Sequence, residues 1–149
     1  MVASSIGEIR VRTGWKRGPA APSTGPVRIS YTQFTPHSVR DIPRIHLAAE
    51  RLRRAGTELE GAVGVTTYWQ PFRRRVGSLS AWEDESALRR FVVLPYHVEI
   101  MREYRARGSL RAVEWFADSF DLAEAFREGE AALERGEGRV AGTPRPGRA

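Results

Sequence analysis

The chain has 149 residues, the size of one ordinary domain, and contains no cysteine. The absence of cysteine excludes disulfide-stapled scaffolds and metal sites built on thiolates. The formal net charge is +6, and Lys16 is the single lysine among the basic residues. No apolar run approaches the ~18 residues of a membrane helix, and residues 1–10 lack the pattern of a signal peptide, so we expect a cytoplasmic protein without a membrane partner.

The first 26 residues predict a short strand followed by a linker. Ile9 and Val11 alternate with charged residues between Glu8 and Arg12, which is the period of a half-buried strand. Residues 14–26 are rich in glycine and proline, which interrupt regular structure. We expect Trp15 to anchor this loop.

Residues 27–135 are predicted to form the core domain. In chain order we expect a strand at 27–34, a helix closed by Gly56, strands at 62–69 and 75–82, a helix capped near Asp84, a second helix opened by Pro95, a strand at 110–117 and a helix at 121–133. The break at Pro95 follows because proline clashes with the preceding turn of a helix. Residues 136–149 bury too little apolar surface to offset their ordering cost, so we expect a disordered tail.

The strand at 75–82 has two contrasting faces, because side chains alternate along a strand. One face is small and aliphatic and the other carries serine and tryptophan: Gly77, Leu79 and Ala81 against Val76, Ser78, Ser80 and Trp82. We expect the aliphatic face to pack under helices and the serine and tryptophan face to line a cavity.

The order of the core elements is strand, helix, strand, strand, helix, strand. This order is typical of the α+β, ferredoxin-like βαββαβ arrangement with an antiparallel sheet, which has helices on one face. The other face must also be covered, and a second copy of the chain is the simplest cover for so small a domain. We therefore expect a homodimer in which two sheets form a barrel around an enclosed space.

Three stretches carry a resemblance to a known superfamily. The run from Ser78 to Phe91, His97 in the following helix, and the strand that ends Glu114-Trp-Phe-Ala117 resemble the dimeric α+β barrel superfamily. The similarity is to its antibiotic biosynthesis monooxygenase-like branch and, more loosely, to spheroidene monooxygenase-like proteins, over about residues 27–118. It implies a dimeric α+β barrel and a choice among cofactor-independent monooxygenases, haem-binding or haem-degrading enzymes, and proteins without chemistry.

The resemblance also implies positions for a site. Trp82 lies where the family places a tryptophan in the pocket wall, and His97 lies where haem-using relatives place an imidazole ligand. The cofactor-free and haem-degrading branches carry an asparagine on the first strand, and this chain contains no asparagine. Gln33, or the hydroxyl groups of Tyr31 and Thr32, could donate a hydrogen bond in its place.

Each candidate residue also has a structural interpretation. His97 could ligate haem iron or act as an acid or base, or it could simply hydrogen-bond a backbone carbonyl. Glu114 could be a base, or an ion-pair partner for one of the many arginines. Tyr31 could donate a proton or could pack in the core. The remaining candidates are expected to bind substrate: Trp82, Ser78, Ser80, Gln33 and Trp69.

Three functions follow from these patterns. The first is a small-molecule-binding dimer acting as a monooxygenase on an aromatic or polycyclic compound, with haem on His97 or with no cofactor. The second is a non-catalytic ligand-binding or structural dimer, which a pocket filled by Trp69, Trp82 and Trp115 would favour. The third is an arginine-rich nucleic-acid-binding module, which composition supports only weakly. The run Arg73-Arg74-Arg75 predicts a solvated turn, and a phosphate-binding tip there would need aromatic or basic neighbours on the same surface.

Overall fold

A computed structural model of the chain describes residues 10–142. Its strands and helices are β1 Val11–Arg12, β2 Lys16–Arg17, β3 Val27–Pro36, α1 Ile42–Thr57, β4 Ala62–Gln70, β5 Arg75–Trp82, α2 Glu85–Val92, α3 Pro95–Arg105, β6 Gly108–Ala117, α4 Leu122–Glu134 and β7 Arg139–Gly142. None of the helices in this part of the chain is long and apolar enough to cross a membrane.

The strands form one antiparallel sheet in the order β1-β4-β5-β3-β6-β7, and β2 also pairs with β4. The central order β4-β5-β3-β6 is that of the ferredoxin-like arrangement, so the predicted α+β fold is confirmed. Two short 3-10 helices, Val39–Asp41 and Pro71–Arg73, lie in the connections. Arg74 ends the second of these in the left-handed region, with φ of 53°, and so turns the chain into β5.

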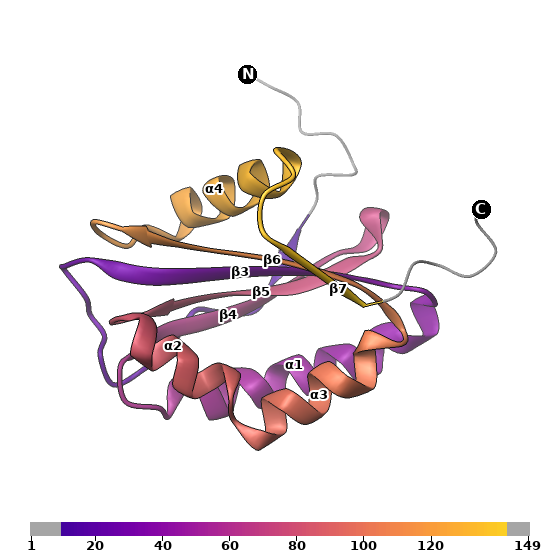
Figure 1. The fold of residues 1–149 in the computed structure, drawn as a ribbon, viewed down its shortest axis with the longest axis horizontal. Helices are drawn as coiled ribbons and strands as arrows, with labels where there is room; N and C mark the ends of the chain where they lie inside the picture. Colours follow the sequence, from indigo (N-terminus) through magenta and orange to yellow (C-terminus); the bar gives the residue numbers. More distant parts are fainter. Residues whose placement is uncertain (1–9, 143–149) are drawn as a thin grey trace.

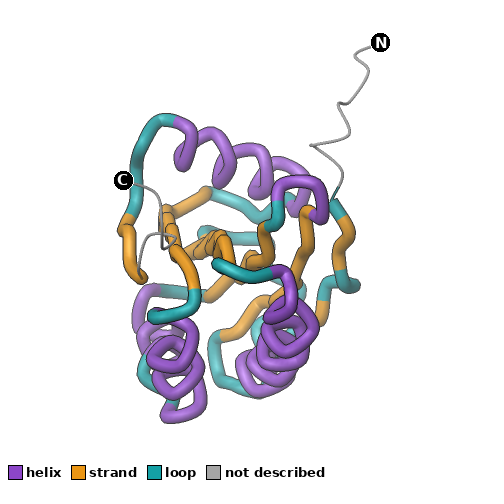
Figure 2. Tube along the Cα trace, turned by 90° about the vertical axis from the view of Figure 1, so that its right-hand side faces the viewer, coloured by secondary structure: helices purple, strands orange, loops and turns teal. Residues whose placement is uncertain are grey.

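Helices cover both faces of the sheet. Figures 1 and 2 show α1, α2 and α3 on one side and α4 alone on the other. We refer to these sides as the three-helix face and the α4 face. The expectation that the sheet has helices on one face only is therefore wrong, because α4 docks on the face that a second copy was expected to cover.

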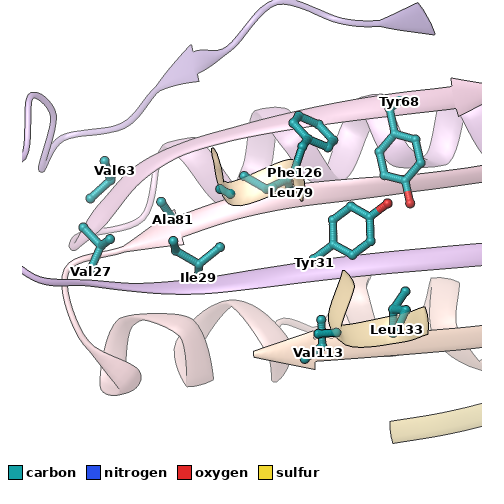
Figure 3. Packing of buried hydrophobic residues seen from close by; sticks show 12 residues of the cluster. Val27, Ile29, Tyr31, Val63, Tyr68, Leu79, Ala81, Val113, Phe126 and Leu133 are labelled. Atoms are coloured by element: carbon teal, nitrogen blue, oxygen red, sulfur yellow. The ribbon is translucent and has the colours of Figure 1, made fainter. Parts of the chain in front are cut away.

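The α4 face holds the larger core cluster. Figure 3 shows Tyr31, Tyr68 and Phe126 packed together beneath α4. The rings of Tyr31 and Tyr68 stack with centroids 5.5 Å apart, and Phe126 meets both of them edge-on. Gly129 of α4 allows this close approach, because a Cβ there would lie 2.6 Å from Cγ of Tyr31. The aromatic cluster thus fixes α4 on the sheet.

The three-helix face holds two smaller core clusters. One joins Trp82 to Leu88 and Phe91 of α2 and to Val65 of β4. The other joins Phe34, Ile45, Val76 and Tyr104, from β3, α1, β5 and α3. The alternation predicted for β5 is confirmed. Its serine and tryptophan face packs under α1, α2 and α3, so the expectation that this face lines a cavity is wrong. The aliphatic face, which includes Leu79 and Ala81, lies under α4.

Several local predictions are confirmed. β5 has the predicted bounds, Asp84 caps α2 by accepting a hydrogen bond from the Ala87 amide at 2.8 Å, and Pro95 opens α3. Trp15 anchors its loop by stacking on Phe120 with centroids 4.7 Å apart.

Other local predictions are wrong. β2 lies within the predicted linker, and β7 lies within the predicted disordered tail, where it pairs with β6. Gly56 is buried inside α1, which ends at a cap formed by Glu58. A β-bulge between Ala62 and Gly64 breaks the alternation of β4 and moves Val63 to the α4 face. Glu8 and Ile9 of the predicted first strand, and residues 143–149 of the tail, lie outside the described residues.

Candidate functional site

On the three-helix face, Phe91 separates Trp82 from His97. The Trp82 ring is fully buried and meets Phe91 with centroids 5.0 Å apart, while His97 meets the same phenyl ring at 4.9 Å. α2 contributes Phe91 and α3 contributes His97, because Pro95 turns the chain between them. The two residues implied by the resemblance thus lie near each other, with an apolar side chain between them.

The His97 side chain is half-buried, and its imidazole hydrogen-bonds the backbone of Val92. Burial lowers the pKa of His97 below its ordinary value, and the hydrogen bond to Val92 offsets part of this effect. The hydrogen bond to the backbone is the contact that the structural interpretation of this histidine described.

The surroundings of His97 do not fit a haem. Phe91 packs on the imidazole, and the fully buried Trp82 packs on Phe91. Of the surface cavities of the described residues, the two best formed are lined by neither His97 nor Trp82. Across residues 10–142, no group of three or more histidine, aspartate or glutamate residues is placed to hold a metal ion.

The serines of β5 are used within the fold. The Ser80 hydroxyl accepts a hydrogen bond from the indole Nε1 of Trp82 at 2.9 Å, and the Ser78 hydroxyl lies 2.8 Å from that of Thr32. Trp69 lies on the same face but at the far end of β4, and 38% of it is exposed. Trp115 packs against the core of the α4 face. The tryptophans therefore do not meet in one pocket.

Glu114 is bound by two arginines on the three-helix face. Its carboxylate accepts hydrogen bonds from Arg139 of β7 at 2.8 Å and from Arg89 of α2 at 3.4 Å, and only 9% of the side chain is exposed. Arg89 also pairs with Glu85 at 3.3 Å. The carboxylate thus ties β6 to β7 and α2, which is the structural role weighed for it against catalysis.

Tyr31 lies on the opposite face of the sheet from His97 and Glu114. Its ring belongs to the core under α4, and its hydroxyl points toward that of Tyr68 (Figure 3). Burial raises the pKa of Tyr31, and the positive charges of Arg10 and Arg75 offset part of this rise. The structure does not bring the three candidate catalytic residues together.

Gln33 lines a cavity of about 320 Å³ between the sheet and α4. We call this space the sheet–α4 cavity; it is also lined by Arg10, Gln70, Arg75, Arg111 and Glu130. Gln33 and Gln70 are both buried, with 7% and 4% of their surfaces exposed. The volume is at the lower end of the range of small-molecule sites.

The strand registers assemble this cavity at one end of the sheet. Gln70 of β4 lies opposite Arg75 of β5, and Gln33 of β3 lies opposite Arg111 of β6. All four side chains alternate onto the α4 face, and Arg10 pairs with Glu130 of α4 at the rim. Four neighbouring strands and one helix therefore each contribute a polar group.

Sequence reasoning identified Gln33 but missed Gln70, Arg75 and Arg111. Gln70 was placed in the hairpin connection, whereas it ends β4. Arg75 was interpreted as part of a solvated run. It lies four residues before Leu79 in β5, and this even spacing places both side chains on the α4 face. Arg111 could have been placed in the same way, because it lies two residues before Val113 in β6 and therefore points to the same face of the sheet.

Neither a protein-family model nor a curated protein matches this chain in sequence. Solved structures match it in fold. SnoaB, a cofactor-independent oxygenase from Streptomyces nogalater, is 17% identical, with a TM-score of 0.52 over 66% of this chain and 97% of SnoaB. A conserved protein from Methanosarcina mazei is 12% identical, with a TM-score of 0.53 over 65% of this chain and 95% of that protein.

A candidate monooxygenase from Lactobacillus acidophilus is 11% identical, with a TM-score of 0.54 over 70% of this chain and 50% of that one. Identities this low establish similarity of fold alone. The comparison confirms that the chain has the α+β fold of the dimeric α+β barrel proteins, as the resemblance implied.

Proposed function

We propose that this chain is a small-molecule-binding protein and that the sheet–α4 cavity is its ligand site. The observation that carries the proposal is the set of buried amide groups facing this space. Gln33 and Gln70 are more than nine-tenths buried, and the Oε1 atom of Gln70 is buried without a hydrogen-bond partner among the described residues. A buried polar atom without a partner costs about 1–3 kcal/mol, which a bound polar ligand would recover.

The separation of the candidate catalytic residues supports binding over catalysis. Tyr31 and Gln33 face α4, whereas His97 and Glu114 lie on the three-helix face. General acid–base catalysis needs its groups within hydrogen-bond reach of one substrate. A single substrate cannot reach both sets through a packed sheet.

A thermal-shift screen tests the binding function. The panel contains neutral, cationic and anionic small molecules, and the protein is compared with Glu134→Trp, which narrows the mouth of the cavity. We expect at least one compound to raise the Tm of the unaltered protein and to lose most of this effect in the variant.

Glu128→Trp is the matched control, because Glu128 is also exposed on α4 but does not line the cavity. The proposal is contradicted if no compound raises the Tm. It is also contradicted if the effect survives in Glu134→Trp as fully as in Glu128→Trp.

The second candidate function is a cofactor-independent oxygenase. It is favoured by the fold shared with SnoaB and by the neutral His97 imidazole beside Phe91 and Trp82. In this version His97 removes a proton from an acidic C–H of a polycyclic substrate, and the resulting carbanion reduces O₂. A CH₂ group then becomes C=O, with one oxygen atom in the product and the other in water.

An oxygen electrode and anthrone, a tricyclic compound with an acidic CH₂ group, test this candidate. The oxygenase predicts O₂ uptake with formation of anthraquinone, at least 100-fold slower in His97→Ala. Uptake no faster than in buffer would contradict it for this substrate class.

Titration with haem is a further test, and from the packing around His97 we expect no Soret shift that depends on this residue.

A homodimer remains part of the proposal, although α4 occupies the face expected to meet a partner. The sheet edge at β7 offers another contact, because it is the last strand of the sheet and Val140 is 73% exposed. An unpaired edge strand readily pairs with a second chain. Analytical ultracentrifugation should find a dimer that Val140→Lys dissociates, and a monomer in both proteins would contradict this contact.

A further inference from the structure

The sheet–α4 cavity concentrates arginine. Arg10, Arg73, Arg75 and Arg111 all line it, against the two acidic residues Glu130 and Glu134. Four positive and two negative groups leave a formal excess of two positive charges in a space of about 320 Å³. Arg73 ends the 3-10 helix before β5 and Arg75 begins β5, and the fold brings Arg10 and Arg111 next to them as further basic neighbours.

Charge pairing within the cavity is incomplete. Arg10 forms an ion pair with Glu130, but Arg75 and Arg111 form no ion pair among residues 10–142. Burial lowers the pKa of Arg75, and the nearby charges of Arg73 and Arg111 lower it further. Both effects indicate that positive groups are gathered in a partly desolvated place.

Two hydrogen-bonding atoms at this cavity are also unsatisfied. The Oε1 atom of Gln70 and the Nε atom of Arg10 are buried without a partner in the described structure. Gln70 is 4% exposed and lies opposite Arg75 across the β4–β5 pair. The Arg111 guanidinium donates to the Leu133 carbonyl and is thereby held at the wall of the cavity. A fixed guanidinium is suited to bidentate recognition of a carboxylate or phosphate.

We infer that the sheet–α4 cavity binds a small organic dianion, with its carboxylate or phosphate group between Arg75 and Arg111. This inference rests on the proposed ligand-binding function and adds the charge class of the ligand. The paired Arg10 and Glu130 close the rim, while the Oε1 atom of Gln70 can accept a hydrogen bond from a hydroxyl group on the uncharged part of the ligand. Two negative charges match the excess of two positive charges, and the volume accommodates a molecule of a few carbon atoms.

Isothermal titration calorimetry tests the inference with two probes, malate for dicarboxylates and glycerol phosphate for phosphate esters. We expect saturable binding of at least one of them to the unaltered chain. Arg75→Gln should weaken this binding at least tenfold, and Arg75→Lys should weaken it less, because lysine keeps the charge but loses the planar fork. Arg111→Gln should act like Arg75→Gln, and Arg75→Gln alone suffices if loss of the Leu133 contact unfolds the Arg111 variant.

Arg102→Gln is the matched control, because Arg102 is exposed on α3 and its loss removes the same formal charge from the other side of the sheet. We expect its affinity to change by less than twofold. Equal weakening in Arg102→Gln and Arg75→Gln would reveal non-specific attraction to a basic surface and overturn the inference.

The same probes separate this inference from the function on which it rests. Suppose neither dianion binds, while a neutral or cationic compound of the thermal-shift panel binds the unaltered chain and not Glu134→Trp. The cavity then remains a ligand site, and the charge class assigned to its ligand is wrong. If no compound of any class binds, both the function and the inference fail.

Discussion

The imidazole of His97 packs edge-on against the phenyl ring of Phe91, with the two centroids 4.9 Å apart. Phe91 makes a second edge-on contact with Trp82. The two residues most strongly implicated by resemblance therefore belong to one packed aromatic group between β5, α2 and α3. Both residues therefore stabilise the fold, and their substitution should change the free energy of unfolding.

Acidification should destabilise the protein through His97. Because burial lowers the pKa of His97 in the folded state, the unfolded chain binds its proton more readily. The stability that the neutral His97 contributes is therefore fully present above the ordinary histidine pKa of 6.5 and is lost as the pH falls below that value. Urea unfolding between pH 7.5 and 5 should show a smaller loss in His97→Gln than in the unaltered protein.

His46→Gln is the control for this measurement, because His46 is exposed on α1. It should keep the pH dependence of the unaltered protein. An identical pH dependence in His97→Gln would mean that His97 is not held neutral by its surroundings.

The secondary structure was largely predictable, because it depends on local patterns. The alternation in β5 and the position of Pro95 gave element boundaries that the structure confirms. β7 was not predictable in this way, because a strand of four residues is stabilised by its pairing with β6 rather than by its own composition. The changed face of Val63 depends on a bulge, which the alternation of apolar residues does not reveal.

The candidate site was less predictable than the fold. The alternation along β3 and β5 gives the two faces of each strand, but it does not relate the faces of one strand to those of its neighbour or say which layer covers each face. Tyr31 and Gln33 were therefore assigned to one site with Ser78 and Trp82, whereas the register of β3 and β5 places them on opposite faces of the sheet. The layer on each face depends on where α4 docks, which is a tertiary contact between Gly129 and the Tyr31 ring. The arginine-lined cavity was missed because Arg75 was interpreted from its neighbours in the sequence, whereas its partners in the cavity come from other strands of the sheet.

Trp82 should contribute far more to stability than Trp69. Trp82 is fully buried in a core cluster, and its truncation to alanine leaves a cavity that costs about 3–5 kcal/mol. Trp69 is 38% exposed on the same face of the sheet, so Trp69→Ala should cost about 1 kcal/mol. Chemical denaturation of the two variants measures both values. Equal costs would show that Trp82 lines open space instead of filling the core.

Two helical glycines should respond in opposite ways to alanine. In a helix interior, alanine is favoured over glycine by about 1 kcal/mol. A Cβ at Gly56 of α1 would meet Phe91 at an ordinary 3.4 Å, so Gly56→Ala should be neutral or stabilising. A Cβ at Gly129 of α4 would lie 2.6 Å from the Tyr31 ring, so Gly129→Ala should be destabilising by about 1–3 kcal/mol.

Thermal unfolding of the two alanine variants compares them directly. A stabilising Gly129→Ala would indicate that α4 does not pack on Tyr31. The sheet–α4 cavity would then lack the wall that α4 provides.

The site of ligand binding can be read from side-chain NMR signals during titration with the compounds of the screening panel. Binding in the sheet–α4 cavity predicts shifts of the side-chain amide signals of Gln33 and Gln70, with the indole signal of Trp82 unchanged. Shifts at Trp82 and His97, with the signals of Gln33 and Gln70 unchanged, would place the ligand on the three-helix face and contradict the account.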